Sequence, residues 1–217
     1  MRKSDRGWFV TEGRDGDRTL EQQMEGLEAL VQQVRNKSVL DFGCAEGLIG
    51  ILLAKYGAKS VTGFDSVAAH LEVGRRMARE EGVDVLLVDA NLNDYDLSTY
   101  EQADVVLLLA ILHKLRNPTH FARVAATLAK DLIVVRLPPS GLVIKDMRSM
   151  MVPHDIGKVL ADEGFAPPEV VPTVNGEWLG YFRRVNGKGE VGEMGPRDEP
   201  GEPAPEPIAP APSPAPA

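Results

Sequence analysis

Runs of apolar residues alternate along the chain with segments in which apolar residues recur at helical spacing. Short apolar runs bounded by glycine, proline or polar residues predict buried strands. Five such runs lie at residues 38–42, 60–64, 83–88, 104–109 and 132–137, and two further strands are expected near 169–171 and 178–185. The run from Asp104 to Leu109 is apolar at every position after the first, which is typical of a central strand covered on both faces.

Helices are predicted between these strands. They are expected from after Gly47 to Tyr56, at about 67–81, from Asn117-Pro118 through Leu128, and at about 155–162. Glycine follows three of them as a C-terminal cap, and Asn117-Pro118 provides an N-cap and a first-turn proline. Repeated strand–helix units imply parallel strands with right-handed crossovers, so we expect an α/β fold with a doubly wound, mostly parallel sheet. Ligands of such sheets bind beyond the carboxyl ends of the strands.

The C-terminal stretch differs from this pattern in composition. Residues 187–217 contain nine of the sixteen prolines, and six acidic against two basic residues give them a net charge of −4. Such a segment buries too little apolar area to offset its ordering entropy, so we expect a disordered acidic, Pro/Ala-rich tail. It is either a solvated tail or a docking peptide for a protein partner. The predicted domain covers residues 19–186, after an N-terminal arm of residues 1–18.

An amphipathic stripe precedes the first predicted strand. Its members are Leu20, Met24, Leu27, Val31 and Val34. The stripe either covers the core or serves partly as a lid over a ligand.

Composition narrows the function classes. The net charge of −8 argues against general binding to DNA, which requires basic residues against the phosphates. The single cysteine, Cys44, excludes an intrachain disulfide and a cysteine-rich metal site. No apolar run reaches about 18 residues, and no signal-peptide stretch opens the sequence, so no membrane contact is expected and a cytoplasmic protein is the simplest expectation.

Three aspartates mark the ends of the first three strands. Asp41, Asp65 and Asp89 each lie at or just after a strand end. The turn after Asp41 carries Gly43 and Gly47, which permit unusual backbone angles and close approach of a ligand. A carboxylate in the position of Asp65 can accept hydrogen bonds from ribose hydroxyls. Asp65 can equally cap the following helix, and the turn by itself can be an ordinary tight turn.

With these residues, positions 19–185 resemble the class I S-adenosylmethionine-dependent methyltransferases. Val39–Gly47, which reads VLDFGCAEG, is similar to the first motif of that family, and Ala103–Leu115, ADVVLLLAILHKL, is similar to its fourth-strand segment. The resemblance implies seven strands in the order 3-2-1-4-5-7-6, with the last antiparallel. It also implies S-adenosylmethionine as cofactor, held by the glycine turn, with Asp65 on the ribose and Asp89 on the adenine. The implied cofactor contacts are Asp41, Gly43, Cys44, Ala45, Gly47, Asp65, Ser66, Asp89, Ala90 and Leu109.

The sequence departs from the family pattern at three positions. Ala45 stands where glycine is commoner, Lys114 replaces a histidine, and Leu109 occupies a position that is often polar. A contact at Leu109 must therefore come from its backbone. A nicotinamide dinucleotide is disfavoured, because its turn reads G-x-G-x-x-G and this one reads Gly-x-Ala-x-Gly.

His113 is the candidate catalytic base, because it follows the fourth strand where an acceptor would approach. The alternative is a histidine that only packs beside the cofactor. Lys114 either orients an anionic acceptor or faces water, and His70 and His154 are expected on helix surfaces. No metal is expected, and the position of Cys44 in the turn argues against methylation at C5 of a pyrimidine. The missing Asn/Asp-Pro-Pro-aromatic motif argues against methylation of base amines.

The predicted function is methyl transfer to an unidentified acceptor, either a small metabolite or a modified RNA group such as a tRNA uridine. The alternative is a non-catalytic protein that keeps this fold and uses its tail to bind a partner. Because all three aspartates and both glycines are present, the first interpretation is favoured.

Overall fold

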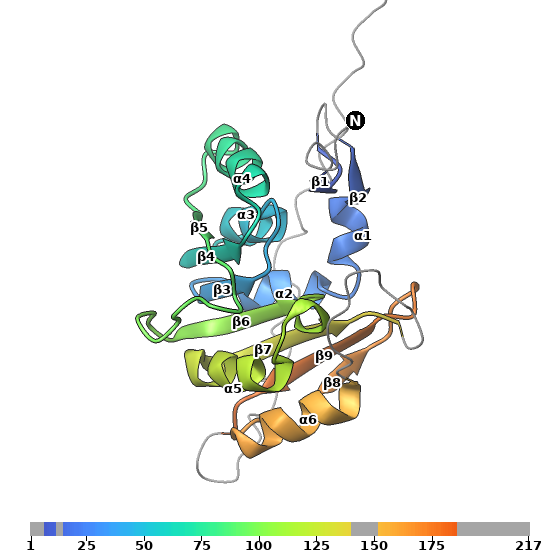
Figure 1. The fold of residues 1–217 in the computed structure, drawn as a ribbon. Helices are drawn as coiled ribbons and strands as arrows, with labels where there is room; N and C mark the ends of the chain where they lie inside the picture. Colours follow the sequence, from blue (N-terminus) through green and yellow to red (C-terminus); the bar gives the residue numbers. More distant parts are fainter. Residues whose placement is uncertain (1–6, 12–14, 140–151, 186–217) are drawn as a thin grey trace, which may run out of the picture. The chain divides into compact units, whose positions relative to one another are not determined.

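The computed structural model describes residues 7–11, 15–139 and 152–185 (Figure 1). Seven strands form one sheet in the order β5-β4-β3-β6-β7-β9-β8. They span Ser38–Phe42 (β3), Ser60–Asp65 (β4), Leu86–Asp89 (β5), Ala103–Leu109 (β6), Ala129–Leu137 (β7), Glu169–Val171 (β8) and Trp178–Arg183 (β9). Strand β9 runs antiparallel to both neighbours, and β3 to β7 pair in parallel. The predicted fold and strand order are confirmed.

Helices cover both faces of this sheet (Figure 1). Helices α5 (Pro118–Leu128) and α6 (Pro153–Asp162) cover one face; α2 (Glu28–Gln33), α3 (Leu48–Lys55) and α4 (Ala68–Glu80) cover the other. Along β6, Val106 and Leu108 join the first core and Val105 and Leu107 the second. This alternation explains the uninterrupted apolar run, because each successive side chain meets a covered face.

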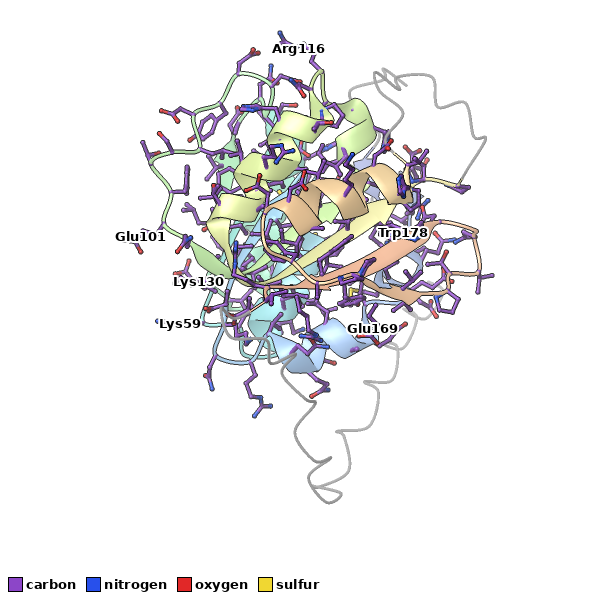
Figure 2. All side chains as sticks on the ribbon, turned by 90° about the horizontal axis from the view of Figure 1, so that it is seen from below. Lys59, Glu101, Arg116, Lys130, Glu169 and Trp178 are labelled. Carbon is purple, nitrogen blue, oxygen red and sulfur yellow. The ribbon has the colours of Figure 1, made fainter. Side chains whose placement is uncertain are left out.

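The two ends of the parallel strands lie at opposite edges of the sheet. Figure 2 shows the charged side chains Lys59, Glu101 and Lys130 together at the edge where β4, β6 and β7 begin. Trp178 lies at the opposite edge, where the parallel strands end and β9 begins. No helix in the described ranges is both long and apolar enough to cross a membrane.

Several predicted element ends were wrong by two or three residues. Strand β5 begins at Leu86 instead of 83, because Val83 still donates its amide to Ala78 at the end of α4. Strand β7 begins earlier, at Ala129, and the next two residues, Lys130 and Asp131, are exposed. Helix α6 starts at Pro153, which takes the first helical position. Strand β9 ends at Arg183 instead of 185.

The N-terminal segment contains structure that the sequence pattern did not predict. Residues Gly7–Phe9 (β1) and Gly16–Arg18 (β2) form a two-stranded parallel sheet, followed by helix α1 (Leu20–Met24). The amphipathic stripe is divided between α1 and α2 by Gly26, whose φ is +75°. Leu27 and Val34 are fully buried, so the stripe covers the core.

Candidate functional site

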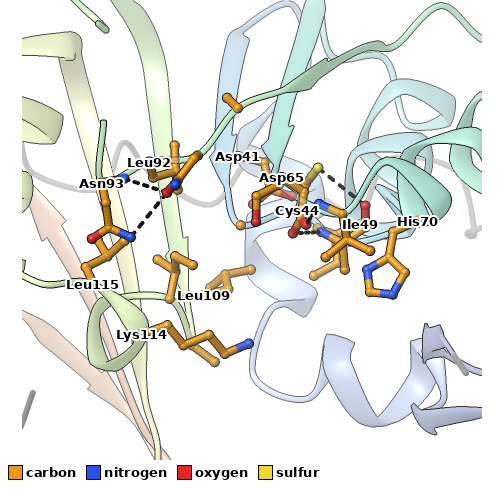
Figure 3. A pocket seen from close by; sticks show the side chains of 18 of the residues that line it. Asp41, Cys44, Ile49, Asp65, His70, Leu92, Asn93, Leu109, Lys114 and Leu115 are labelled. Carbon is orange, nitrogen blue, oxygen red and sulfur yellow. Dashed lines mark hydrogen bonds between the residues drawn. The ribbon is translucent and has the colours of Figure 1, made fainter. Parts of the chain in front are cut away.

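A cavity of about 380 Å³ opens at the carboxyl ends of β3, β4 and β6 (Figure 3). The end of β3, the glycine turn, the start of α4, the segment after β5 and the segment after β6 form most of its wall. The N-terminal segment completes the wall with Phe9 and Gln23. The cavity therefore lies where a doubly wound sheet is expected to bind its ligand.

Most of the residues predicted to hold a cofactor meet in this cavity. They are Asp41, Gly43, Cys44, Ala45, Asp65, Ser66, Ala90 and Leu109. Gly47 and Asp89 are not among the lining residues. Gly47 instead forms the N-cap of α3 in a left-handed conformation, and exposed Asp89 adjoins the lining residue Ala90.

The glycine turn is shaped by left-handed backbone angles. The φ values are +84° at Gly43, +52° at Ala45 and +70° at Gly47. An alanine in this region is strained by roughly 1–2 kcal/mol, which explains why glycine is commoner at the position of Ala45. A side chain at Gly43 would lie 2.8 Å from Ile111 Cδ1, so glycine keeps the turn and the segment after β6 in contact.

Asp65 fixes the turn as well as lining the cavity. One carboxylate oxygen accepts the Ala45 amide at 3.0 Å and the other accepts the Val67 amide at 2.9 Å. Each oxygen has a second lone pair, so hydroxyl groups of a ligand can still be accepted. Asp65 thus supports the turn and retains capacity for a ribose, but it does not cap α4, whose N-cap Val67 has no side-chain hydrogen bond.

Asp41 and Cys44 have perturbed acidities. Burial, with the negative charge of Asp65, raises the pKa of Asp41 to about 7. Burial raises the pKa of the Cys44 thiol well above its usual value, and the charges of Asp41 and Asp65 add to this effect. The thiol therefore stays protonated and is a poor nucleophile.

His113 lies outside the set of lining residues. It is 5% exposed within the short 3₁₀ helix η2 (Leu112–Lys114). Burial, with the nearby charge of Lys114, lowers the pKa of His113 to about 4, so its ring is neutral at neutral pH and a weak base. This geometry favours the packing alternative. Lys114 itself lines the cavity (Figure 3).

His70 lines the cavity, although it was expected on a helix surface. Of the four histidines, all within the described ranges, His70 alone lines the cavity. A signal was present, because a residue in the first turn of the helix after β4 faces the carboxyl edge of the sheet. His154 is exposed as expected. Among the described residues, no group of three His, Cys, Asp or Glu is arranged to hold a metal ion.

Comparisons with known proteins find similarity over part of the chain. Residues 39–131 match the family model described as a methyltransferase domain. The match covers less than half of the chain, so it shows that this part is similar to a methyltransferase domain, and the strand order is that of the class I methyltransferase fold.

Individual relatives agree with this class. The ubiquinone biosynthesis O-methyltransferase of Serratia proteamaculans is 34% identical over 95 residues, which are 44% of this chain and 39% of that enzyme. The match thus covers well under half of that relative. The S-adenosylhomocysteine-bound magnesium protoporphyrin IX methyltransferase of Synechocystis PCC 6803 has a similar fold, with a TM-score of 0.61 and 21% identity over 75% of this chain and 83% of that one. A methyltransferase from Aquifex aeolicus has a TM-score of 0.60 at 17% identity, over 75% and 92% of the two chains.

Proposed function

We propose that this chain transfers the methyl group of S-adenosylmethionine to a hydroxyl oxygen of a small-molecule acceptor. The observation that carries the proposal is the cavity itself, in which Asp41, the glycine turn and Asp65 meet within a domain of this class. The choice of oxygen is supported by the named activity of the Serratia relative.

The residues of the cavity fit the proposed cofactor in chemistry. The Asp65 carboxylate, with Asp41 beside it, lines a cavity that would receive a sulfonium cation, and opposite charge favours its binding. In the proposal, Asp65 accepts the ribose hydroxyls with its remaining lone pairs. The backbone of Gly43 to Ala45 approaches the amino-acid part closely, since no large side chain intervenes. Ala90 and Asp89 remain the proposed adenine contacts, with Asn91 beside them.

When bound, the cofactor supplies an electrophilic methyl group, and the chain aligns the acceptor oxygen and excludes water. Phe9 and Ile111 provide apolar surface at the wall, and both are buried or half-buried. The backbone of Leu109 and Ala110 is the proposed contact at the end of β6, where Ala110 has a left-handed φ of +56°. Such a conformation turns the chain sharply at the cavity.

Calorimetry with S-adenosylhomocysteine tests the proposal. We expect one site per chain, and Asp65→Ala should weaken it about ten-fold or more, because hydrogen bonds to a charged acceptor contribute roughly 1.5–3 kcal/mol each. Asp65→Asn keeps one side-chain oxygen, so it retains part of the hydrogen bonding to the amides of Ala45 and Val67. Comparing it with Asp65→Ala separates the loss of ligand binding from a change in the geometry of the turn. Asp84→Ala, an exposed aspartate before β5, is the control and should leave affinity unchanged.

Absence of binding by folded protein to both S-adenosylhomocysteine and S-adenosylmethionine would contradict the proposal. The acceptor is then sought with methyl-labelled S-adenosylmethionine in a cell extract separated into small-molecule and RNA fractions. Label in the small-molecule fraction supports the acceptor class, whereas label in RNA would replace it with the RNA alternative.

A further inference from the structure

Gln23 is a buried polar residue in the wall of the cavity. It lies in α1 and is 3% exposed. Its backbone oxygen accepts a hydrogen bond from Nη1 of Arg136 at 2.7 Å, and its side-chain Oε1 accepts one from Nη1 of Arg18 at 3.5 Å. Because a guanidinium can only donate, Oε1 is the atom that faces Arg18, and the amide nitrogen Nε2 is the end of the side chain left for another contact.

The amide nitrogen of Gln23 is an available donor. Nε2 donates to no acceptor in the part of the chain that the structure describes. It differs from Nδ1 of His70 and Nδ1 of His113, which are unpartnered and sealed from solvent, because Nε2 keeps accessible surface. The residue is otherwise buried, and the space that it adjoins is the cavity. An oxygen of a ligand in the cavity can therefore reach this donor and complete its hydrogen bonding.

A cation faces the same cavity. Lys114 lies in η2, just beyond the end of β6, and lines the cavity. Figure 3 shows its side chain extending below Leu109, with the nitrogen directed away from Leu115. Among the described lining residues the other lysine or arginine is Arg116, whose Nη2 donates to both carboxylate oxygens of Asp94 at 2.8 Å. Lys114 is therefore the cation best placed to meet an anionic ligand.

Gln23 and Lys114 belong to the side of the cavity that lies beyond β6 and β7. Arg136 on β7, which binds the Gln23 backbone, pairs with the last residue of β6, and η2 follows that strand. The acidic residues of the wall, Asp41 and Asp65, lie instead at the ends of β3 and β4. The cavity is thus divided in charge. In the proposed function the cofactor occupies the side of β3 and β4, which leaves the other side to the acceptor.

We propose that the acceptor carries a carboxylate in addition to its hydroxyl group, and that Lys114 and Gln23 bind this carboxylate; the assignment rests on the proposed function. An ammonium and the amide nitrogen of glutamine only donate, and an ionised carboxylate only accepts, so the groups match. The single charge of a carboxylate also suits one ammonium better than a phosphate, whose charge is about −1.5 to −2. Asp65 repels an anion from the cofactor side, which leaves the hydroxyl group of the acceptor facing the methyl group. The acceptor class is thus a small hydroxy acid.

Binding of paired probes to the protein saturated with S-adenosylhomocysteine tests this proposal. The probes are the isomers of hydroxybenzoate and the corresponding hydroxybenzamides, which keep the shape and lose the charge. Calorimetry should show at least one acid bound about ten-fold or more tightly than its amide. Lys114→Met should abolish this preference by weakening the acid and should change the affinity of the amide by less than about two-fold.

Gln23→Glu tests the second contact. It keeps an oxygen for Arg18 but replaces the N–H donor with a negative charge, so it should weaken the acid about ten-fold or more and spare the amide. Lys130→Met is the matched control, because Lys130 is an exposed lysine at the opposite edge of the sheet (Figure 2), and it should change neither affinity. All three variants should bind S-adenosylhomocysteine as the wild-type protein does, which also shows that they are folded.

Three outcomes would overturn the proposal. They are equal affinities for acids and amides, a preference that survives in Lys114→Met, and no binding of any acid to the protein saturated with S-adenosylhomocysteine. A ten-fold loss of S-adenosylhomocysteine affinity in Lys114→Met would also overturn it, because Lys114 would then hold the carboxylate of the cofactor. Failure of the wild-type protein to bind S-adenosylhomocysteine and S-adenosylmethionine is a different result, which contradicts the proposed function itself.

Discussion

The ionisation of Asp41 is strongly coupled to the fold. Its folded-state pKa of about 7, against an ordinary value of 3.8, means that the native protein holds a proton that the unfolded chain releases. Stability that depends on this proton is fully present below about pH 4 and is lost as the pH rises through about 7. The difference corresponds to up to about 4 kcal/mol.

Asp41→Asn removes this dependence. We expect the wild-type protein to lose free energy of unfolding relative to the variant between about pH 5 and about pH 8, with no further change above. Urea unfolding at a series of pH values measures it. Asp104→Asn is the control: hydrogen bonds from Ser38 lower the pKa of Asp104, so its titration lies below this range and the difference should stay flat. A flat difference for Asp41→Asn as well would show that Asp41 is not desolvated.

At the residue scale, two histidines show that the position of a residue in the sequence does not determine whether its side chain reaches the cavity. His113 follows a strand that ends at the cavity, yet it is buried and is not among the residues that line the cavity. His70 was assigned to a surface, yet it lines the cavity. Both outcomes depend on which side of a helix meets the sheet, and that is a property of packing.

At the scale of elements, the N-terminal segment is anchored by a buried arginine. Arg136 on β7 is fully buried and donates to the backbone oxygens of Gln23 at 2.7 Å and Glu25 at 2.5 Å, at the end of α1. Glu177 lies 3.6 Å from its Nε and also pairs with Arg18 at 2.5 Å. Arg136 thus donates to carbonyl groups at the C-terminal end of α1, which have no partner within the helix. One of these carbonyl groups belongs to Gln23, a residue that also lines the cavity.

Arg136→Met should therefore destabilise the protein by about 3–5 kcal/mol, because it leaves helix carbonyls and the buried Glu177 without this cation. Arg183→Met, on the neighbouring strand β9, is the control and should cost less than about 0.5 kcal/mol, since Arg183 is exposed. Urea denaturation gives both values. Adding Glu177→Gln to Arg136→Met should recover part of the lost free energy of unfolding. A loss below about 1 kcal/mol for Arg136→Met alone would show that α1 is held by its apolar contacts alone.

The elements themselves were largely predictable from sequence. Every strand of the main sheet was identified, since buried parallel strands produce uninterrupted apolar runs. Glycine and proline marked most helix ends. Strands β1 and β2 were missed, because three-residue strands with glycine at their start carry no periodic signal.

At the scale of the whole molecule, composition separates the domain from residues 187–217. Deleting these residues should leave the melting temperature nearly unchanged, because the segment has only Val191, Met194 and Ile208 as large apolar side chains. Thermal unfolding of the full chain and of residues 1–186 measures the effect. A large fall in melting temperature would show that the segment packs on the domain. We also expect the deletion to leave the affinity for S-adenosylhomocysteine unchanged.

The sequence by itself determined the class of fold, the strand order through resemblance, and the position of Asp41, the glycine turn and Asp65 at the carboxyl ends of strands. These features follow from local periodicity and from residues adjacent in the chain. Tertiary structure alone decided that Phe9 binds Glu46, 37 residues away, and that Arg136 reaches Gln23, 113 residues away. It also decided that His70 enters the cavity and His113 does not. Such contacts depend on how elements distant in sequence pack, because burial and partner choice arise only when the sheet and its helices assemble.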